Sequence, residues 1–86
     1  MTTKYEEKIV VNSLKAKEVI LETLQENGVH AWLSQAFDGH TIITFFASDA
    51  NKVLEVLKKC FPTFYKYEWF TIWPKNDGTC ILGTKF

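Results

Sequence analysis

Asp38-Gly39 stands between two apolar runs, residues 29–37 and 40–47, and no other dipeptide constrains the fold as strongly. Asp-Gly is typical of a two-residue β-hairpin turn, because both turn residues take positive φ angles. Such a turn also fixes the register, so that the numbers of facing residues sum to 77. On one side of the ribbon this register brings together four side chains: Trp32, Ser34, Ile43 and Phe45.

Helical periodicity appears on both sides of the predicted hairpin. Apolar residues recur three and four positions apart between Ser13 and Gly28, and again between Ser48 and Pro62. Serine is a favoured helix N-cap, whereas glycine and proline commonly end helices. The sequence therefore predicts one helix before the hairpin and one after it.

Three further segments predict strands. Residues 7–12 are rich in β-branched side chains, residues 64–73 form a long aromatic run, and residues 79–86 follow a turn-forming segment. The predicted order is βαββαβ plus a C-terminal strand. It indicates an α+β fold, a ferredoxin-like sandwich in which both helices cover one face of an antiparallel sheet. Residues 1–86 are expected to form a single domain, because so short a chain supports one core.

The segment FYKYEWFTIW, residues 64–73, contains six aromatic residues and has no polar side when it is read as a strand. A strand that is apolar on both sides is buried on both sides. One set of rings is then core, and the other is covered either by the C-terminal hairpin or by a partner. The expected interaction surface is this set: Trp32, Ile43, Phe45, Tyr65, Tyr67, Trp69 and Trp73.

The charges of the chain argue against a polyanionic partner. The formal net charge is zero, and every basic residue is lysine. Nucleic-acid affinity comes largely from basic side chains that neutralise phosphates, and arginine is the usual residue for a bidentate phosphate contact. Nucleic acid is therefore not the expected partner.

The residue types that usually carry catalysis are scattered. Cys60 and Cys80 are far apart and lack CxxC spacing, which gives no disulfide framework or metal motif. His30 and His40 fall at opposite ends of the predicted hairpin, so they cannot share a metal ion. The sequence predicts no enzyme, no metal site and no cofactor.

The predicted topology resembles that of the RNA-recognition motif. Residues 9–14 and 39–45 stand where that family has its two conserved strand motifs. The positions that carry base-stacking aromatics in the family hold Val10, His40 and Ile42 here. The resemblance implies single-stranded RNA binding, which stays open as an alternative function.

Residues 9–58 also resemble the ACT-type regulatory domain. The similarity lies in five segments: Glu26-Asn27-Gly28-Val29, Ser34-Gln35, residues 41–46, Asp49, and Val53-Leu54 with Leu57. It implies a non-catalytic module that pairs with a second copy and binds a small metabolite at the seam. The family's ligand loop usually contains glycine, whereas this chain has Asn12-Ser13-Leu14. Metabolite sensing by a dimer is a second alternative.

Together these features predict a non-enzymatic protein-interaction module, an accessory regulator or inhibitor that binds a protein and can pair with itself as a homodimer. The rim of its surface is expected at four residues: His30, Gln35, Lys66 and Lys75. The N-terminus has no apolar signal segment, and no apolar run approaches the roughly 20 residues of a membrane-spanning helix. We therefore expect a cytoplasmic protein that does not enter a membrane.

Overall fold

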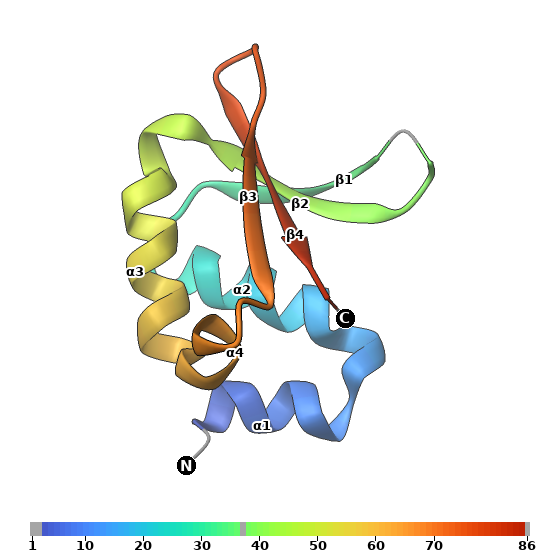
Figure 1. The fold of residues 1–86 in the computed structure, drawn as a ribbon, viewed down its shortest axis with the longest axis vertical. Coiled ribbons are helices and arrows are strands. Elements are labelled where there is room, and N and C mark those ends of the chain that lie inside the picture. The colour runs from blue at the N-terminus through green and yellow to red at the C-terminus, as the bar shows by residue number, and fades with distance from the viewer. Residues whose placement is uncertain (1–2, 37, 86) are drawn as a thin grey trace.

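A computed structural model describes residues 3–36 and 38–85. They form a small α+β fold with four helices and a four-stranded antiparallel sheet (Figure 1). The elements are α1 (Lys4–Val11), α2 (Ala16–Glu26), β1 (Ala31–Gln35), β2 (Thr41–Phe46), α3 (Ala50–Cys60), α4 (Pro62–Lys66), β3 (Phe70–Pro74) and β4 (Thr79–Thr84), with short 3-10 turns at Ser13–Lys15 and Ala47–Asp49.

The strands lie in the order β1-β2-β4-β3, so the two hairpins meet along β2 and β4. Each hairpin follows a helical segment: α2 precedes β1 and β2, whereas α3 and α4 precede β3 and β4. Beyond their shared ladder the two hairpins point in different directions, and the helices gather on one side of them (Figure 1). β1 and β3 are the edge strands of the sheet.

The strand predicted at residues 7–12 is wrong, because this segment belongs to helix α1 and the coil after it. A capping box starts the helix: the Thr3 hydroxyl accepts a hydrogen bond from the Glu6 N–H, and the Glu6 carboxylate accepts one from the Thr3 N–H. Thr-x-x-Glu is a helix-start signature that offsets the strand preference of the β-branched residues. The expected βαββαβ order is therefore not the one observed.

The long strand predicted at residues 64–73 is also wrong in its first half. Pro62 ends α3, as expected, but it also occupies the first turn of α4, where its missing N–H costs no hydrogen bond. The chain then turns, and β3 begins at Phe70. The last predicted strand is confirmed over Thr79–Thr84, whereas residue 86 lies outside the described residues.

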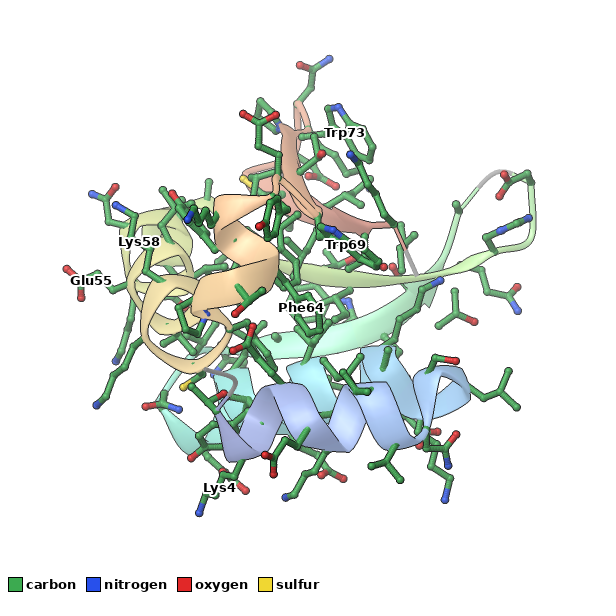
Figure 2. The ribbon with its side chains drawn as sticks, turned by 60° about the horizontal axis from the view of Figure 1, so that its bottom comes forward. Lys4, Glu55, Lys58, Phe64, Trp69 and Trp73 are labelled. Atoms are coloured by element: carbon green, nitrogen blue, oxygen red, sulfur yellow. The ribbon has the colours of Figure 1, made fainter. Side chains whose placement is uncertain are left out.

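The turn between α4 and β3 holds a glutamate in a backbone conformation that favours glycine. The Trp69 N–H donates to the Phe64 carbonyl, and the Glu68 N–H donates to the Tyr65 carbonyl, which is the Schellman pattern of helix ends. The rings of Phe64 and Trp69 pack 5.4 Å apart as its apolar contact (Figure 2). Glu68 takes φ = +59°, the left-handed position of this motif.

Glu68→Gly is expected to stabilise the protein by about 0.5–1 kcal/mol, because glycine adopts positive φ without a Cβ clash. The free energy of unfolding from urea titration measures this. Glu55→Gly is the matched control: Glu55 is exposed within α3 and points into solvent (Figure 2). In a helix interior the same substitution costs about 1 kcal/mol. Destabilisation by Glu68→Gly would contradict the assignment.

The hairpin is present, but its predicted register is wrong by one residue. Ala31 faces Phe45, so the numbers of facing residues sum to 76. The Ala36 N–H donates to the His40 carbonyl, which leaves three residues in the loop, and Gly39 takes φ = +87°. Because side chains alternate along a strand, the shift moves the β2 side chains to the opposite face.

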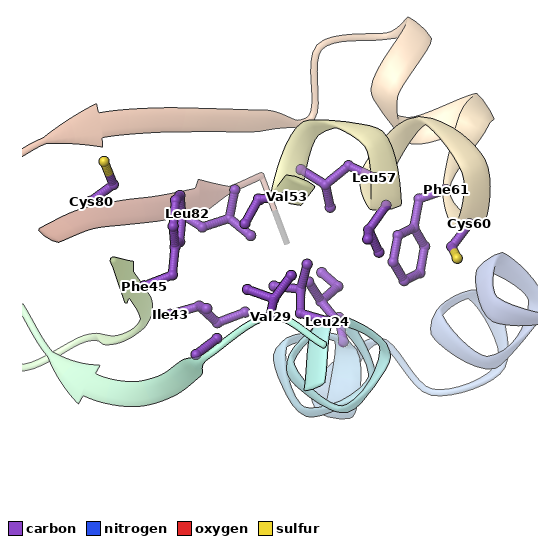
Figure 3. Close-up of a cluster of buried hydrophobic side chains, with 14 of the residues drawn as sticks. Leu24, Val29, Ile43, Phe45, Val53, Leu57, Cys60, Phe61, Cys80 and Leu82 are labelled. Atoms are coloured by element: carbon purple, nitrogen blue, oxygen red, sulfur yellow. The ribbon is translucent and has the colours of Figure 1, made fainter. Parts of the chain in front are cut away.

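The core lies between the helices and one face of the sheet (Figure 3). Phe45 and Ile43 are buried there, paired across the β2–β4 ladder with Cys80 and Leu82. Helices α2 and α3 supply the opposing side chains: Ile20, Leu24, Val53, Val56 and Leu57. This single core orients the sheet and leaves its other face turned away from the helices.

Candidate binding face of the sheet

The face of the sheet opposite the helices carries a group of apolar and aromatic side chains. Strand alternation assigns ten residues to it, and we call them the open face: Trp32, Ser34, Ile42, Thr44, Phe46, Thr71, Trp73, Thr79, Ile81 and Gly83. Trp73 is 55% exposed and Phe46 44% exposed. β3 and β4 extend the sheet instead of folding over it, so the C-terminal hairpin does not cover this face.

One row of residues crosses all four strands of the open face. Trp32 pairs with Thr44, Thr44 with Ile81, and Ile81 with Trp73. Neighbouring strands lie about 4.8 Å apart, so the backbones of the two outer residues are roughly 14 Å apart. The row therefore ends in an indole at each edge of the sheet, with smaller side chains between them.

The aromatic rings are held by contacts within the chain. A Cβ atom on Gly83 would lie 2.5 Å from Cζ3 of Trp73, so the indole covers the glycine on the neighbouring strand. On the other side, the rings of Trp32 and Phe46 meet edge to face with centroids 5.1 Å apart. The His30 ring lies 6.0 Å from Phe46 at the margin of the face. These contacts limit ring motion and reduce the entropy lost on binding.

Gly83→Ala is expected to push the Trp73 indole off the sheet and to cost about 1–2 kcal/mol of stability, because a methyl group cannot share that space. Urea unfolding and a red shift of tryptophan emission measure the two effects. The control repeats the substitution in a Trp73→Leu background, where the cost should shrink. An equal cost in both backgrounds would contradict the contact.

The polar groups of the open face are neutral. The Ser34 and Thr44 hydroxyls hydrogen-bond to each other at 2.6 Å, which satisfies two polar groups of this face. Among the ten open-face residues none has an ionisable side chain, and His30 is the titratable group at the margin. The face therefore suits apolar contact and offers no acid–base pair.

The predicted surface residues lie in three different places. Trp32 and Trp73 are on the open face, whereas Ile43 and Phe45 are buried in the core and cannot contact a partner. The remaining three belong to the α4 region: Tyr65 is partly buried in the helix, Tyr67 is 63% exposed after it, and Trp69 packs on Phe64.

Sequence reasoning missed three apolar members of the open face. Ile42 and Phe46 alternate with the residues that were selected, so the one-residue register error excluded them. Ile81 becomes part of the face only through its pairing with Thr44 and Trp73. Local sequence gives no signal for this pairing, because β2 and β4 are distant in the chain.

The predicted rim residues are also dispersed. His30 borders the open face, whereas Gln35 ends β1 on its helix-facing side. The Lys66 ammonium lies 6.0 Å from the centre of the Tyr67 ring. Lys75 pairs with Asp77 at 3.6 Å in the β3–β4 turn. Only His30 is therefore placed to contact a molecule bound flat on the sheet.

The other titratable groups have local structural roles. Hydrogen bonds from Thr79 hold the pKa of Asp77 below its usual value and fix the β3–β4 turn. Burial raises the pKa of the Cys60 thiol, which leaves it protonated and unreactive at neutral pH. Residues 3–36 and 38–85 contain no cluster of three His, Cys, Asp or Glu side chains able to hold a metal ion.

Comparison with known proteins gives no relative: no family model matches the chain, and neither a curated protein nor a solved structure does. The resemblances to the RNA-recognition motif and to the ACT-type domain therefore stay predictions. Within the described part of the chain, every helix is too short or too polar to cross a bilayer.

Proposed function

We propose that this protein is a non-enzymatic interaction module that binds another protein through the open face. The observation that carries the proposal is the exposure of Phe46 and Trp73 on the sheet face opposite the core, with the Trp32 ring packed edge to face on Phe46. Contiguous exposed apolar patches commonly mark interaction sites, and tryptophan is enriched among residues that dominate binding energy. An accessory regulator or inhibitor acting in the cytoplasm fits such a module.

The absence of charge on the open face favours a protein surface that is itself apolar. Burying a charged group without a partner is costly, whereas the neutral open face carries no such penalty. Two copies of the face would also meet without repulsion between like charges. Self-association is therefore the first form of the proposal to test, by sedimentation over a wide range of protein concentration.

The four-stranded face is small. It spans roughly 14 Å across the strands, so it supplies less than the 800 Å² or so that each partner buries in a standard stable interface. We therefore expect a weak dimer or a partner that also contacts the rim near His30. In either case the two tryptophans should dominate affinity.

Site-specific crosslinking tests the proposal. A photo-reactive amino acid replaces Trp73 on the open face, or Leu14 as the control, which is an exposed apolar residue outside that face. We expect crosslinks to a second polypeptide from position 73 and none from position 14. Trp32→Ser should weaken the same complex by about tenfold or more. Equal crosslinking from both positions would refute the open face as the site.

Single-stranded nucleic acid is the second candidate, because exposed rings on a sheet can stack on bases. Trp32, Phe46 and Trp73 would provide the stacking surface. Among the described residues, however, no lysine lies on the open face to neutralise phosphates. Oligonucleotide binding that weakens steeply with salt would favour this candidate over a protein partner.

A further inference from the structure

Strand β3 is an edge strand with unused hydrogen-bonding groups. The Lys85 N–H donates to the Trp69 carbonyl and the Lys75 N–H to the Thr79 carbonyl, so residues 69 and 75 face β4. In an antiparallel ladder the direction alternates with each residue. The N–H and C=O groups of Phe70 and Ile72 therefore point away from β4, toward the outside of the sheet.

The opposite edge of the sheet is partly covered. The same alternation turns the backbone groups of Ala31 and Leu33 outward on β1. The side-chain amide of Gln25 donates to the Ala31 carbonyl at 3.0 Å. No side chain of residues 3–36 or 38–85 makes a hydrogen bond of this kind to Phe70 or Ile72. Exposed edges usually carry such protection in monomeric proteins, because an unpaired edge is a template for another strand.

A groove of about 510 Å³ runs beside the uncovered edge. Its floor and walls are mostly apolar and come from α3, α4 and β3: Ala50, Leu54, Tyr65, Phe70 and Ile72. A strand placed next to β3 would direct every second side chain into this groove. The groove and the unpaired backbone therefore fit one extended ligand.

The groove carries two charged side chains, both from the segment that enters β3. Lys66 and Glu68 line it there, and both are exposed. Lys66 lies over the Tyr67 ring, whereas Glu68 has no ion pair among the described residues. Glu68 also keeps its left-handed backbone where glycine would be unstrained. A free carboxylate in this place complements a basic group on the ligand.

We propose that an extended peptide segment of a partner protein adds to β3 as a fifth, antiparallel strand. Its alternate side chains are apolar and occupy the groove over Leu54. A lysine or arginine near its C-terminal end lies opposite Glu68, because an antiparallel strand ends where β3 begins. β3 has five residues, which limits the paired segment to roughly 17 Å.

A short peptide fits this edge better than a second copy of the chain. In a pair of β3 strands, the Phe70 and Ile72 side chains of each copy line the groove of that copy. β3 has only five residues, so the contact between two copies is far below the area of a stable dimer. The groove and the β3 edge are separate from the open face, so a result that refutes this proposal does not refute the function proposed above.

A library of synthetic hexapeptides, acetylated and amidated at their ends, tests the proposal. Its members alternate apolar residues with threonine and end in lysine or, as the matched control, norleucine. Binding is followed on the full chain by amide chemical shifts and hydrogen exchange. We expect lysine-ended peptides to bind and to slow exchange at Phe70 and Ile72 by about tenfold or more. Glu68→Gln should weaken the lysine series about threefold to fivefold and leave the norleucine series unchanged.

Two edge substitutions complete the experiment. Ile72→Pro removes an outward N–H and should reduce binding at least about tenfold, whereas Leu33→Pro, the same change on β1, should not alter it. Leu54→Lys places a charge in the groove and gives a second test if the proline variant fails to fold. Absence of binding by the whole library, shifts confined to the open face, or dimers paired through β3 would each overturn the proposal.

Discussion

Phe45→Ala is expected to lower the free energy of unfolding by about 3–5 kcal/mol, whereas Phe46→Ala lowers it by less than about 1 kcal/mol. The Phe45 side chain is 0% exposed and packs in the core between the sheet and the helices. Its neighbour Phe46 lies on the open face and is half exposed. A loss of this size is a large part of the total stability of so small a domain.

Urea unfolding followed by circular dichroism measures both variants, and each residue is the control for the other. The substitution is chemically identical, so the difference reports which face each ring occupies. In the register that sums to 77 the two results would be exchanged, and that exchange would contradict the observed pairing. Binding should show the opposite ranking, because Phe46→Ala removes a ring from the proposed interface and Phe45→Ala does not.

The hairpin was predictable, but its register was not. Asp38-Gly39 marks a turn, yet the dipeptide fits a loop of two residues and a loop of three, in which only Gly39 needs positive φ. The apolar pattern of β2 cannot choose between them, because isoleucine and phenylalanine occupy both of its sides: Ile42, Ile43, Phe45 and Phe46. The observed register is the one in which Ile43 and Phe45 pack in the core with side chains of α2 and α3.

Local capping explains the other differences between sequence and structure. Residues 7–12 have strand propensity, but the Thr3–Glu6 capping box and the burial of Ile9 favour a helix. The aromatic run 64–73 contains the end of α4. The sequence does not mark this end, because Glu68 occupies the left-handed position where glycine is usual. Propensity is a weak guide wherever caps and tertiary contacts disagree with it.

The binding surfaces depend on pairings that the sequence does not reveal. Trp73 was predictable as an exposed candidate, but its support by Gly83 requires the β3–β4 register. The open edge of β3 also depends on the strand pairing, since a strand lies at an edge only when no other strand pairs with one of its sides. Such features come only from the three-dimensional structure.

Glu6→Ala is expected to cost about 3 kcal/mol or more, because it removes a buried carboxylate that accepts three backbone hydrogen bonds. One carboxylate oxygen accepts from the N–H groups of Thr63 and Phe64 at 2.9 and 3.2 Å, at the start of α4. The other accepts from the Thr3 N–H at 3.2 Å. Glu6 is fully buried, so water cannot replace these bonds without opening the structure.

This single side chain joins helix α1 to the start of helix α4. It closes the capping box of α1 and also satisfies the first N–H groups of α4, more than fifty residues later in the chain. The Thr3 hydroxyl adds a hydrogen bond to the Cys60 carbonyl at the end of α3. Loss of Glu6 should therefore loosen α1 and disturb the Phe64–Trp69 contact that follows the α4 start.

Glu6→Gln distinguishes the contribution of the carboxylate hydrogen bonds to stability from the contribution of side-chain packing. The amide keeps the volume but has one acceptor oxygen, so an N–H group must face the N–H of Thr3 or those of Thr63 and Phe64. We expect a loss of about 1–3 kcal/mol, smaller than that of Glu6→Ala. Glu7→Ala is the matched control on the exposed side of α1, with a change within about 0.5 kcal/mol. Urea unfolding measures all three, and equal losses at positions 6 and 7 would show that α1 is not held to α4 by this carboxylate.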